Sequence, residues 1–554
     1  MSSTNQETPG RQRPPLTFGV ELEFLVPYLY EGEPDVHRDI VGLPPPIRLP
    51  RGLTGNQTDE AIHGAIRDLF RDNKIPVDLQ PIPYKSDFER DALHRNSVWI
   101  VTNDLTIEEH SESDSKFVGV EINGPVELDE PEAFRVINHV REVLLRNVRV
   151  RVNPSCGLHV HVGTGSERFT PSSLRRICSL VWAAEHLLVK LNHPSRTIND
   201  TCKPRRYYSN ISGHANGTPT EGEEGPDHTI PEQNIDMICH DYLGADVRHG
   251  EELTSFREKN VSYRRGLSYY TADYSGAFVN ARREGGYLPF QVGRSPKAKG
   301  KDYDMLEPDQ EIEFRLRQYS RSASNPPSNP TLDEEELAKL PYTRTLRRIV
   351  NTPLTAEQRQ RYVDFLEMYL GIVHLESEGV RKFPDPGVFE GVDRLYNGQS
   401  SCEIAFWIGP RHAEWVSLAA YNCSNIREEK RTIEFRGAEA SLSDWVTTWA
   451  RICIGLVRFA TSAPADDFMK VLDKCDRSVK EQGVYDVIDF IVDIGLPAEA
   501  ALAEKHLQEN FEEFGLEFAA PHEPDPEPQG SESGDSEDSE LEAEGLTFIT
   551  VGNY

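Results

Sequence analysis

Two histidines, His159 and His161, lie in a stretch that alternates strictly between polar and apolar residues. Leu158, Val160 and Val162 take the other positions, so in a β-strand both imidazoles share one face and the apolar side chains form the other. A single His-x-His pair is compatible with zinc ligands or with histidines packed in a core. Its chemistry therefore depends on the residues that share its face.

Three other stretches show the same alternation with charged residues on the polar side. They span residues 17–26, 117–122 and 432–436. Glu is a poor strand former, so four strands that each place Glu, His or Arg opposite an apolar face predict one sheet with a charged surface. The polar residues of these three stretches include Glu21, Glu23, Glu121, Glu434 and Arg436.

Clustered carboxylates repel one another, so such a surface needs cations. Carboxylate oxygens suit Mg2+ or Mn2+, and an imidazole can complete the ligand set. Arg436 shares a face with Glu434 and either pairs with a glutamate or holds a phosphoryl or carboxylate group of a substrate. The pattern favours hard cations and anionic substrates.

Simpler interpretations exist for several of these residues. Glu21 and Glu23 would also suit a strand that faces solvent, although their neighbours Phe18 and Phe24 favour a buried strand lining a cleft. Asp104 follows a strand and is either a ligand or a turn residue. Two groups are weaker candidates for substrate contacts, residues 205–208 and 421–422.

Cys156, beside the histidine pair, is a candidate nucleophile. We favour a packing thiol, because no neighbouring residue in the sequence is placed to orient a thiolate.

Composition narrows the class of protein. The 554 residues include 60 Lys and Arg against 91 Asp and Glu, a net charge of −31. This charge argues against nucleic-acid binding and against an anionic membrane surface. Eight cysteines without a Cys-x-x-Cys pair, and no secretory signal, predict reduced thiols inside the cell. We expect a cytoplasmic protein, with the nucleus as an alternative, and no membrane-spanning helix. The oligomeric state is not predicted.

Helices and one more strand complete the expected framework. A strand is expected over 98–102, and Asp59, Thr170 and Ser443 are candidate N-caps. Apolar residues at helical spacing predict helices over 59–72, 131–146, 170–192, 355–374, 443–461 and 480–515.

The fold class predicted is α+β, with a mainly antiparallel sheet covered on one face by helices 131–146, 170–192, 355–374 and 443–461. The expected segments are a disordered leader, a catalytic domain in two halves, a partly ordered insertion between them and an acidic disordered tail. Their ranges are 1–15, 16–201 with 346–520, 202–345 and 521–554.

The order and the sequences of these stretches resemble those of the amidoligase family, which is related to glutamine synthetase and glutamate–cysteine ligase. The resemblance covers residues 16–200 and 400–463 and implies a glutamine synthetase-like catalytic domain. The motifs that carry it are FGVELEF (18–24), the strand from Trp99 to Asp104, GVEINGP (119–125), CGLHVHVG (156–163) and YN with TIEFRGAEASL (421–442).

The resemblance implies an ATP-dependent ligase that joins a carboxylate to an amine through an acyl phosphate. Substrates would be small molecules or peptides. Arg436, with Glu23 and Glu434, would contact the nucleotide, and His161 and Arg436 would lie near substrate or phosphate. The positions matching metal ligands, holding Mg2+ or Mn2+ against ATP, are Glu21, Glu23, Glu121, His159 and Glu434.

Two other functions remain open from sequence. One is a metal-dependent hydrolase built on the histidine pair, which would bind zinc or manganese without nucleotide. The other is a non-catalytic binding protein that retains the fold. Carboxylates clustered on one face argue against the binding protein, because a site that had lost its activity would not be expected to retain them.

Overall fold

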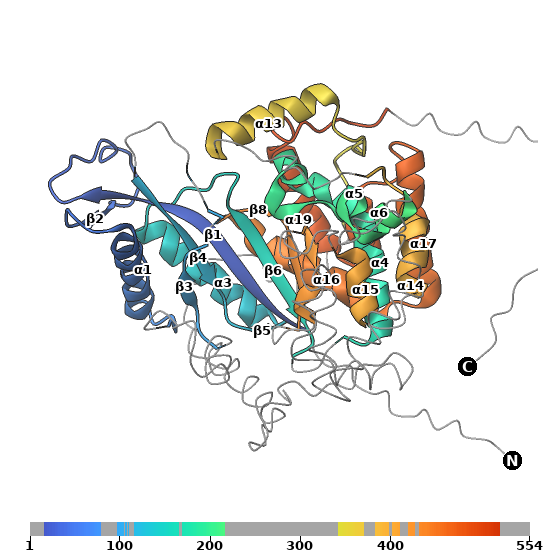
Figure 1. The fold of residues 1–554 in the computed structure, drawn as a ribbon, viewed down its shortest axis with the longest axis horizontal. Coiled ribbons are helices and arrows are strands. Elements are labelled where there is room, and N and C mark those ends of the chain that lie inside the picture. The colour runs from blue at the N-terminus through green and yellow to red at the C-terminus, as the bar shows by residue number, and fades with distance from the viewer. Residues whose placement is uncertain are drawn as a thin grey trace, which may run out of the picture. The chain divides into compact units, whose positions relative to one another are not determined.

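An eight-stranded sheet organises the part of the chain that the structure describes (Figure 1). In this computed structural model, all described residues up to Ala519 belong to one unit, and residues 520–554 form a second. The description covers residues 16–78, 97–104, 106, 107, 109, 116–165, 169–216, 342–370, 383–397, 401–409, 419–426 and 431–520.

The strands run in the order β3-β4-β1-β6-β8-β7, each antiparallel to its neighbour. At the ends of β1, β2 pairs in parallel and β5 in antiparallel fashion. The predicted strands are all present. The strands are β1 (Thr17–Tyr30), β2 (Ile47–Leu49), β3 (Ile100–Thr102), β4 (Lys116–Asn123), β5 (Glu127–Leu128), β6 (Gly157–Gly163), β7 (Tyr421–Asn422) and β8 (Ile433–Glu439).

Helices cover the apolar face of this sheet. Helices α1 (Gly55–Asp72), α3 (Pro131–Asn147) and α16 (Trp445–Ser462) pack near it. Phe18 of β1 stacks on Phe134 of α3 with ring centroids 5.0 Å apart, and the alternating apolar side chains of β1, β4, β6 and β8 are buried in one core. The α+β class and the mainly antiparallel sheet are therefore confirmed.

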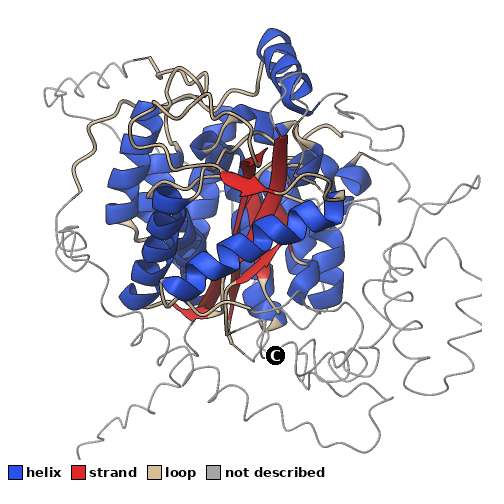
Figure 2. Cartoon of the chain, turned by 90° about the vertical axis from the view of Figure 1, so that its left-hand side faces the viewer, coloured by secondary structure: helices blue, strands red, loops and turns tan. Residues whose placement is uncertain are grey.

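More helices pack around this layer, and Figure 2 shows the strands at the centre among them. Helix α4 (Pro171–Leu188) makes its main contacts with other helices, α14 (Val388–Asn397), α15 (Ser401–Ile408), α16 and α17 (Ala465–Lys480). Helix α13 (Ala356–Leu370) packs mainly on the short 3-10 helix η2 (Pro194–Thr197). Two further helices are α18 (Val487–Asp493) and α19 (Pro497–Glu509). No described helix is long and apolar enough to cross a membrane.

Several predicted helix boundaries are wrong. Helix α1 starts at Gly55 with Thr54 as its N-cap, in a capping box with Gln57, so Asp59 lies inside the helix. Thr170 does cap α4. The N-cap of α16 is Asp444, although the Ser443 hydroxyl accepts a hydrogen bond from the Trp445 N–H at 3.2 Å.

The region predicted to be helical, residues 480–515, contains two separate helices, α18 and α19. Three helices, α17, α18 and α19, occupy residues 465–509. Gly483 and Gly495 stand between them with φ of +77° and +87°, a left-handed conformation that suits glycine and ends a helix. Pro497 then opens α19 at a position where its missing N–H costs nothing.

The first part of the predicted insertion is packed into the core. Helices α5 (Arg205–Tyr208) and α6 (Asn210–Ala215) pack on α4 and α15, with Ile211 buried. Residues 217–341 of the predicted insertion lie outside the described residues, as do the predicted leader and tail. Among the side chains that the structure describes, six cysteines are free thiols, all of them buried.

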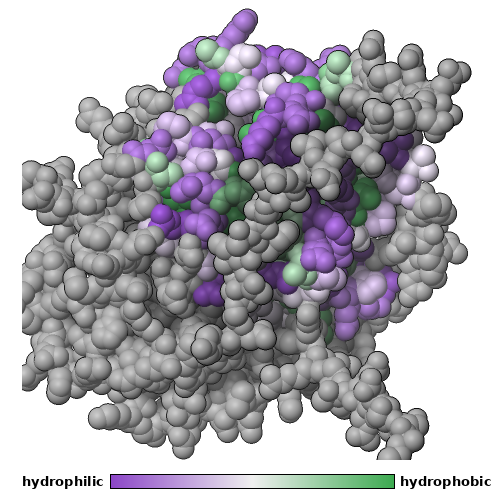
Figure 3. Space-filling view, turned by 90° about the vertical axis from the view of Figure 1, so that its right-hand side faces the viewer, coloured by the Kyte–Doolittle hydropathy of each residue, from purple (hydrophilic) through white to green (hydrophobic). Residues whose placement is uncertain are grey.

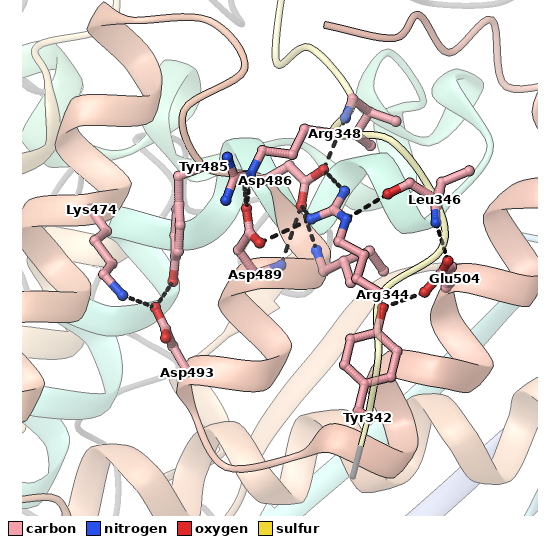
Figure 4. Close-up of polar contacts among 12 residues, drawn as sticks. Tyr342, Arg344, Leu346, Arg348, Lys474, Tyr485, Asp486, Asp489, Asp493 and Glu504 are labelled. Atoms are coloured by element: carbon pink, nitrogen blue, oxygen red, sulfur yellow. Dashed lines mark hydrogen bonds and ion pairs between the residues drawn. The ribbon is translucent and has the colours of Figure 1, made fainter. Parts of the chain in front are cut away.

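After residue 341 the chain returns as a strap, residues 342–350, across α18 and α19. Arg344 pairs with Asp486 and Asp489, while Glu504 accepts hydrogen bonds from the Tyr342 hydroxyl and the Leu346 N–H (Figure 4). A pocket of about 390 Å³ opens beside the strap, lined by Tyr342, Arg344, Arg348, Lys474, Arg477, Val484, Tyr485, Ile488, Asp489, Val492 and Asp493.

None of these pocket residues lies on the polar side of the sheet. Arg344 and Lys474 are already paired with aspartates across it. The described surface seen in Figure 3 is mainly hydrophilic with small scattered apolar spots.

Candidate active site

The register of the sheet brings the predicted polar residues together. Glu21 lies directly opposite His159, and Glu23 lies opposite Glu121. His161 lies opposite Glu434. Residues that pair directly across strands point to the same side of a sheet. We call this side the polar face, and its predicted members are Glu21, Glu23, Glu121, His159, His161, Glu434 and Arg436.

A bulge in β8 places the arginine among them. Val160 pairs with Phe435 and Leu158 pairs with Ala438, so Arg436 and Gly437 together face His159. One extra residue in a strand re-aims the side chains around it. The Arg436 Nη1 lies 2.7 Å from Glu434 Oε1 and 3.3 Å from His159 Nδ1.

The first cluster on the polar face consists of Glu21, His159 and Glu434. One ligand atom from each lies within 4.8 Å of the others. The two oxygens of Glu21 contact both histidines, at 3.1 Å from His159 Nδ1 and 2.9 Å from His161 Nε2. His161 is fixed on its other nitrogen by the Thr432 hydroxyl at 3.0 Å.

Two side-chain amide groups fix the orientation of the Glu434 carboxylate. The Nδ2 atoms of Asn422 and Asn425 both donate to its Oε2, at 2.9 and 3.0 Å. Its Oε1 is left to face Arg436 and the histidines. Asn422 was a weaker candidate from sequence and Asn425 was not predicted. The position of Asn422 on the strand beside β8 is the signal that could have indicated this role.

The second cluster consists of Glu23, Asp104 and Glu121, again within 4.8 Å of one another. Glu23 Oε2 accepts the Gly157 N–H at 2.6 Å, while its Oε1 is buried without a hydrogen-bond partner. Glu121 accepts the Asn123 amide at 2.5 Å. Asp104 Oδ1 also accepts the Thr106 N–H at 2.6 Å, which agrees with a turn residue, and its place in this cluster is compatible with a ligand.

Burial dominates the electrostatics of these acids. Burial, then the charges of Glu21, Glu23 and Asp104, raises the pKa of Glu121 well above its usual value. Burial likewise raises the pKa of Glu23, against the opposing effect of His159 and Arg436. Burial opposes ionisation of Glu434 too, yet Arg436 and His161 hold its pKa at about 2. Arg436 therefore offsets the negative charge of Glu434, whereas the charged neighbours of Glu121 are acids.

These donors fit a divalent cation. Carboxylate oxygens with one imidazole are the ligands that Mg2+ and Mn2+ take. Glu23 Oε1 forms no hydrogen bond and lies 3.3 Å from His159 Nδ1, so it is a buried acceptor that a bound cation would satisfy. At the first cluster a cation would share Glu434 with Arg436.

Two other sequence candidates have different surroundings. Cys156 is buried with Leu25, Ile107 and Ala440, and burial raises the pKa of its thiol to about 12. That environment is typical of a packing thiol. In residues 205–208, the backbone N–H groups of Arg205 and Arg206 donate to the buried Glu185, and Arg206 pairs with Asp385, so this segment is held in the helical core.

A family model described as "putative amidoligase enzyme" matches residues 14–222. The resemblance to the amidoligase family is confirmed. The match includes β1, β4 and β6 with their acids and histidines, and ends before β8. No curated protein and no solved structure matches the chain. The family supports a ligase-type function for this amidoligase-like chain.

Proposed function

We propose that this protein is an ATP-dependent ligase that joins a carboxylate to an amine in an amide or isopeptide bond. Mg2+ or Mn2+ would assist, and the activated species would be an acyl phosphate. The observation that supports this most is the pair of adjacent acidic clusters on one sheet face, with Arg436 beside them. The family match supplies the ligase class.

The two clusters of the polar face would each hold one cation. Glu21, His159 and Glu434 would hold one cation, and Glu23, Glu121 and Asp104 a second. When bound, the cations would neutralise phosphate charge, which is the main requirement of phosphoryl transfer.

The protein's own groups keep these ligands in place. Asn422 and Asn425 keep the Glu434 carboxylate in one orientation, and Thr432 does the same for the His161 ring. Arg436 places a fixed positive charge on the polar face for a phosphoryl or carboxylate oxygen. The acid and the amine remain to be identified.

Thermal-shift titration tests the proposal. Wild type, Glu21→Gln and Glu434→Gln are each titrated with ATP, with Mg2+ and with both. We expect the wild-type melting temperature to rise when both ligands are present, through preferential binding to the folded state. Both variants should lose that rise. Glu60→Gln on α1, an exposed glutamate, is the matched control and should behave as wild type.

Stabilisation of the wild type by zinc alone would instead favour the hydrolase. No response to nucleotide or metal would contradict the ligase and favour a binding protein.

A further inference from the structure

A second buried arginine, Arg196, lies on the polar face. A Cβ built on Gly157 would be 2.6 Å from His159 Nε2 and 3.1 Å from Arg196 Nη2. Gly157 and His159 are two residues apart on β6, so the space above Gly157 belongs to the same face. The guanidinium therefore lies beside the histidine of the first cluster, in space that only a glycine leaves open.

The backbone around Arg196 is fixed. It is part of η2, where the His193 ring accepts the Ser195 N–H. The His193 N–H donates to Glu439 at 2.7 Å, which ties η2 to the end of β8. Arg196 Nη2 donates to the backbone oxygen of Arg436 at 2.8 Å. These contacts hold the side chain against the polar face.

The charge of Arg196 is not matched by a hydrogen-bonded acid. The side chain is 3% exposed, and its Nε and Nη1 have no hydrogen-bond partner. It forms no ion pair with any carboxylate of the described residues, whereas Arg436 is paired with Glu434. A buried guanidinium that has no paired carboxylate and two nitrogens without acceptors is costly, and a bound anion removes that cost.

We propose that Arg196 receives a carboxylate of the acid substrate. The inference rests on the proposed ligase function, in which the acidic clusters and their cations carry the phosphates. A carboxylate that approaches this face meets repulsion from the glutamates. Arg196 is a buried cation beside them with hydrogen-bond donors to spare, and a guanidinium is suited to two-point binding of a carboxylate.

Ligand binding to Arg196→Gln and Arg196→Lys tests the role. Calorimetry would first measure the affinity for Mg–ATP. In the presence of Mg–ATP it would then measure the affinities for orthophosphate and for glutarate, which is a small dicarboxylate probe. We expect Arg196→Gln to weaken glutarate binding at least about tenfold, as for a lost charge-assisted hydrogen bond. The Mg–ATP affinity of Arg196→Gln should stay within about twofold of the wild type. Arg196→Lys should have an intermediate glutarate affinity, because lysine keeps the positive charge but cannot form the two parallel hydrogen bonds of a guanidinium.

Arg67→Gln is the matched control. Arg67 is also buried, donates to one backbone oxygen at 2.7 Å and has an Nε without a hydrogen-bond partner, but it pairs with Glu60 and lies on α1. It should leave glutarate binding unchanged, and circular dichroism would check that all variants fold. If Arg196→Gln does not fold, the Arg196→Lys comparison decides alone.

The possible failures are distinguishable. Glutarate affinity that is equal in wild type and Arg196 variants, or absent from the wild type, overturns this role while Mg–ATP binding upholds the ligase. If the Arg196 variants instead bind only orthophosphate more weakly, Arg196 contacts a phosphoryl group, and the proposed carboxylate role is overturned. Failure of the wild type to bind Mg–ATP counts against the ligase itself.

Discussion

Three glutamates of the polar face are each held by a neutral N–H group. The Gly157 backbone holds Glu23, Asn123 holds Glu121, and two asparagines hold Glu434. A neutral donor fixes the direction of a carboxylate without cancelling its charge. The acids therefore stay oriented, and a bound cation would favour the charged forms of Glu23 and Glu121, whose pKa values burial raises.

Glu127 shows the opposite situation away from the polar face. This residue of β5 is buried with an unpartnered Oε1, and burial, with Glu130, raises its pKa to about 8. Its folded-state pKa exceeds the unfolded value of 4.5, so folding takes up a proton between these values. The wild type should thus lose stability relative to Glu127→Gln from about pH 4.5 to about pH 8, and the difference should level off above. Urea denaturation across this range measures it, and a pH-independent difference would refute the shift.

At the scale of elements, alternation along single strands was enough to predict which residues share the polar face. The period of two fixes the side of every residue, whichever strand lies next to it. Sequence did not predict the β8 bulge or the contacts of Asn425 with Glu434, because both depend on pairing with distant strands. Helix ends were less predictable, since Thr54 and Asp59 are both good N-cap residues and only the folded chain selects one.

The close packing above β6 gives an element-scale prediction. Gly157→Ala would force a methyl group against His159 and Arg196, so Mg–ATP affinity should fall at least about tenfold while the fold persists. Gly437→Ala is the control on the neighbouring strand, because its Cβ would meet only the Ala420 Cβ at 3.9 Å. Calorimetric titration compares the two, and equal affinities would show that this space is not critical.

The strap over α18 gives a second element-scale prediction. Arg344 pairs with Asp486 (Figure 4). Asp486 is a fully buried carboxylate that also accepts the Ile349 N–H. Arg344→Ala would leave that charge without its cation and should lower the free energy of unfolding by about 3–5 kcal/mol. Arg348→Ala, which removes a more exposed partner of Asp489, should cost at most about 1 kcal/mol. Chemical denaturation measures the free energy of unfolding of both variants. Similar losses of stability in the two would contradict the assigned role of Asp486.

At the scale of the whole molecule, the polar face is assembled from segments that lie far apart in the sequence. His159 and Arg436 are in contact although 277 residues separate them. The segment that matches the amidoligase family ends at residue 222 and supplies neither Glu434 nor Arg436. It also lacks α16, whose Trp449 and Ile452 are buried in the main core.

A chain that ends after residue 222 should therefore not unfold cooperatively. It keeps β1, β4 and β6 but loses the β8 partner of β6 and much of the helical core. Urea denaturation followed by near-UV circular dichroism measures this. A chain that ends after Ala520 keeps every described element and is the control. A sharp transition in the shorter chain would mean that the matching segment is a folding unit.

This assembly from distant segments has a consequence for synthesis of the protein. At typical elongation rates, about 15–50 seconds pass between the emergence of β6 and that of β8 from the ribosome. Throughout that interval the nascent chain carries Glu21, Glu23 and Glu121 without Arg436, and β6 has one edge without a partner strand. An unpaired strand edge invites pairing with other chains. Newly made copies should accordingly depend on chaperones until the last strand arrives.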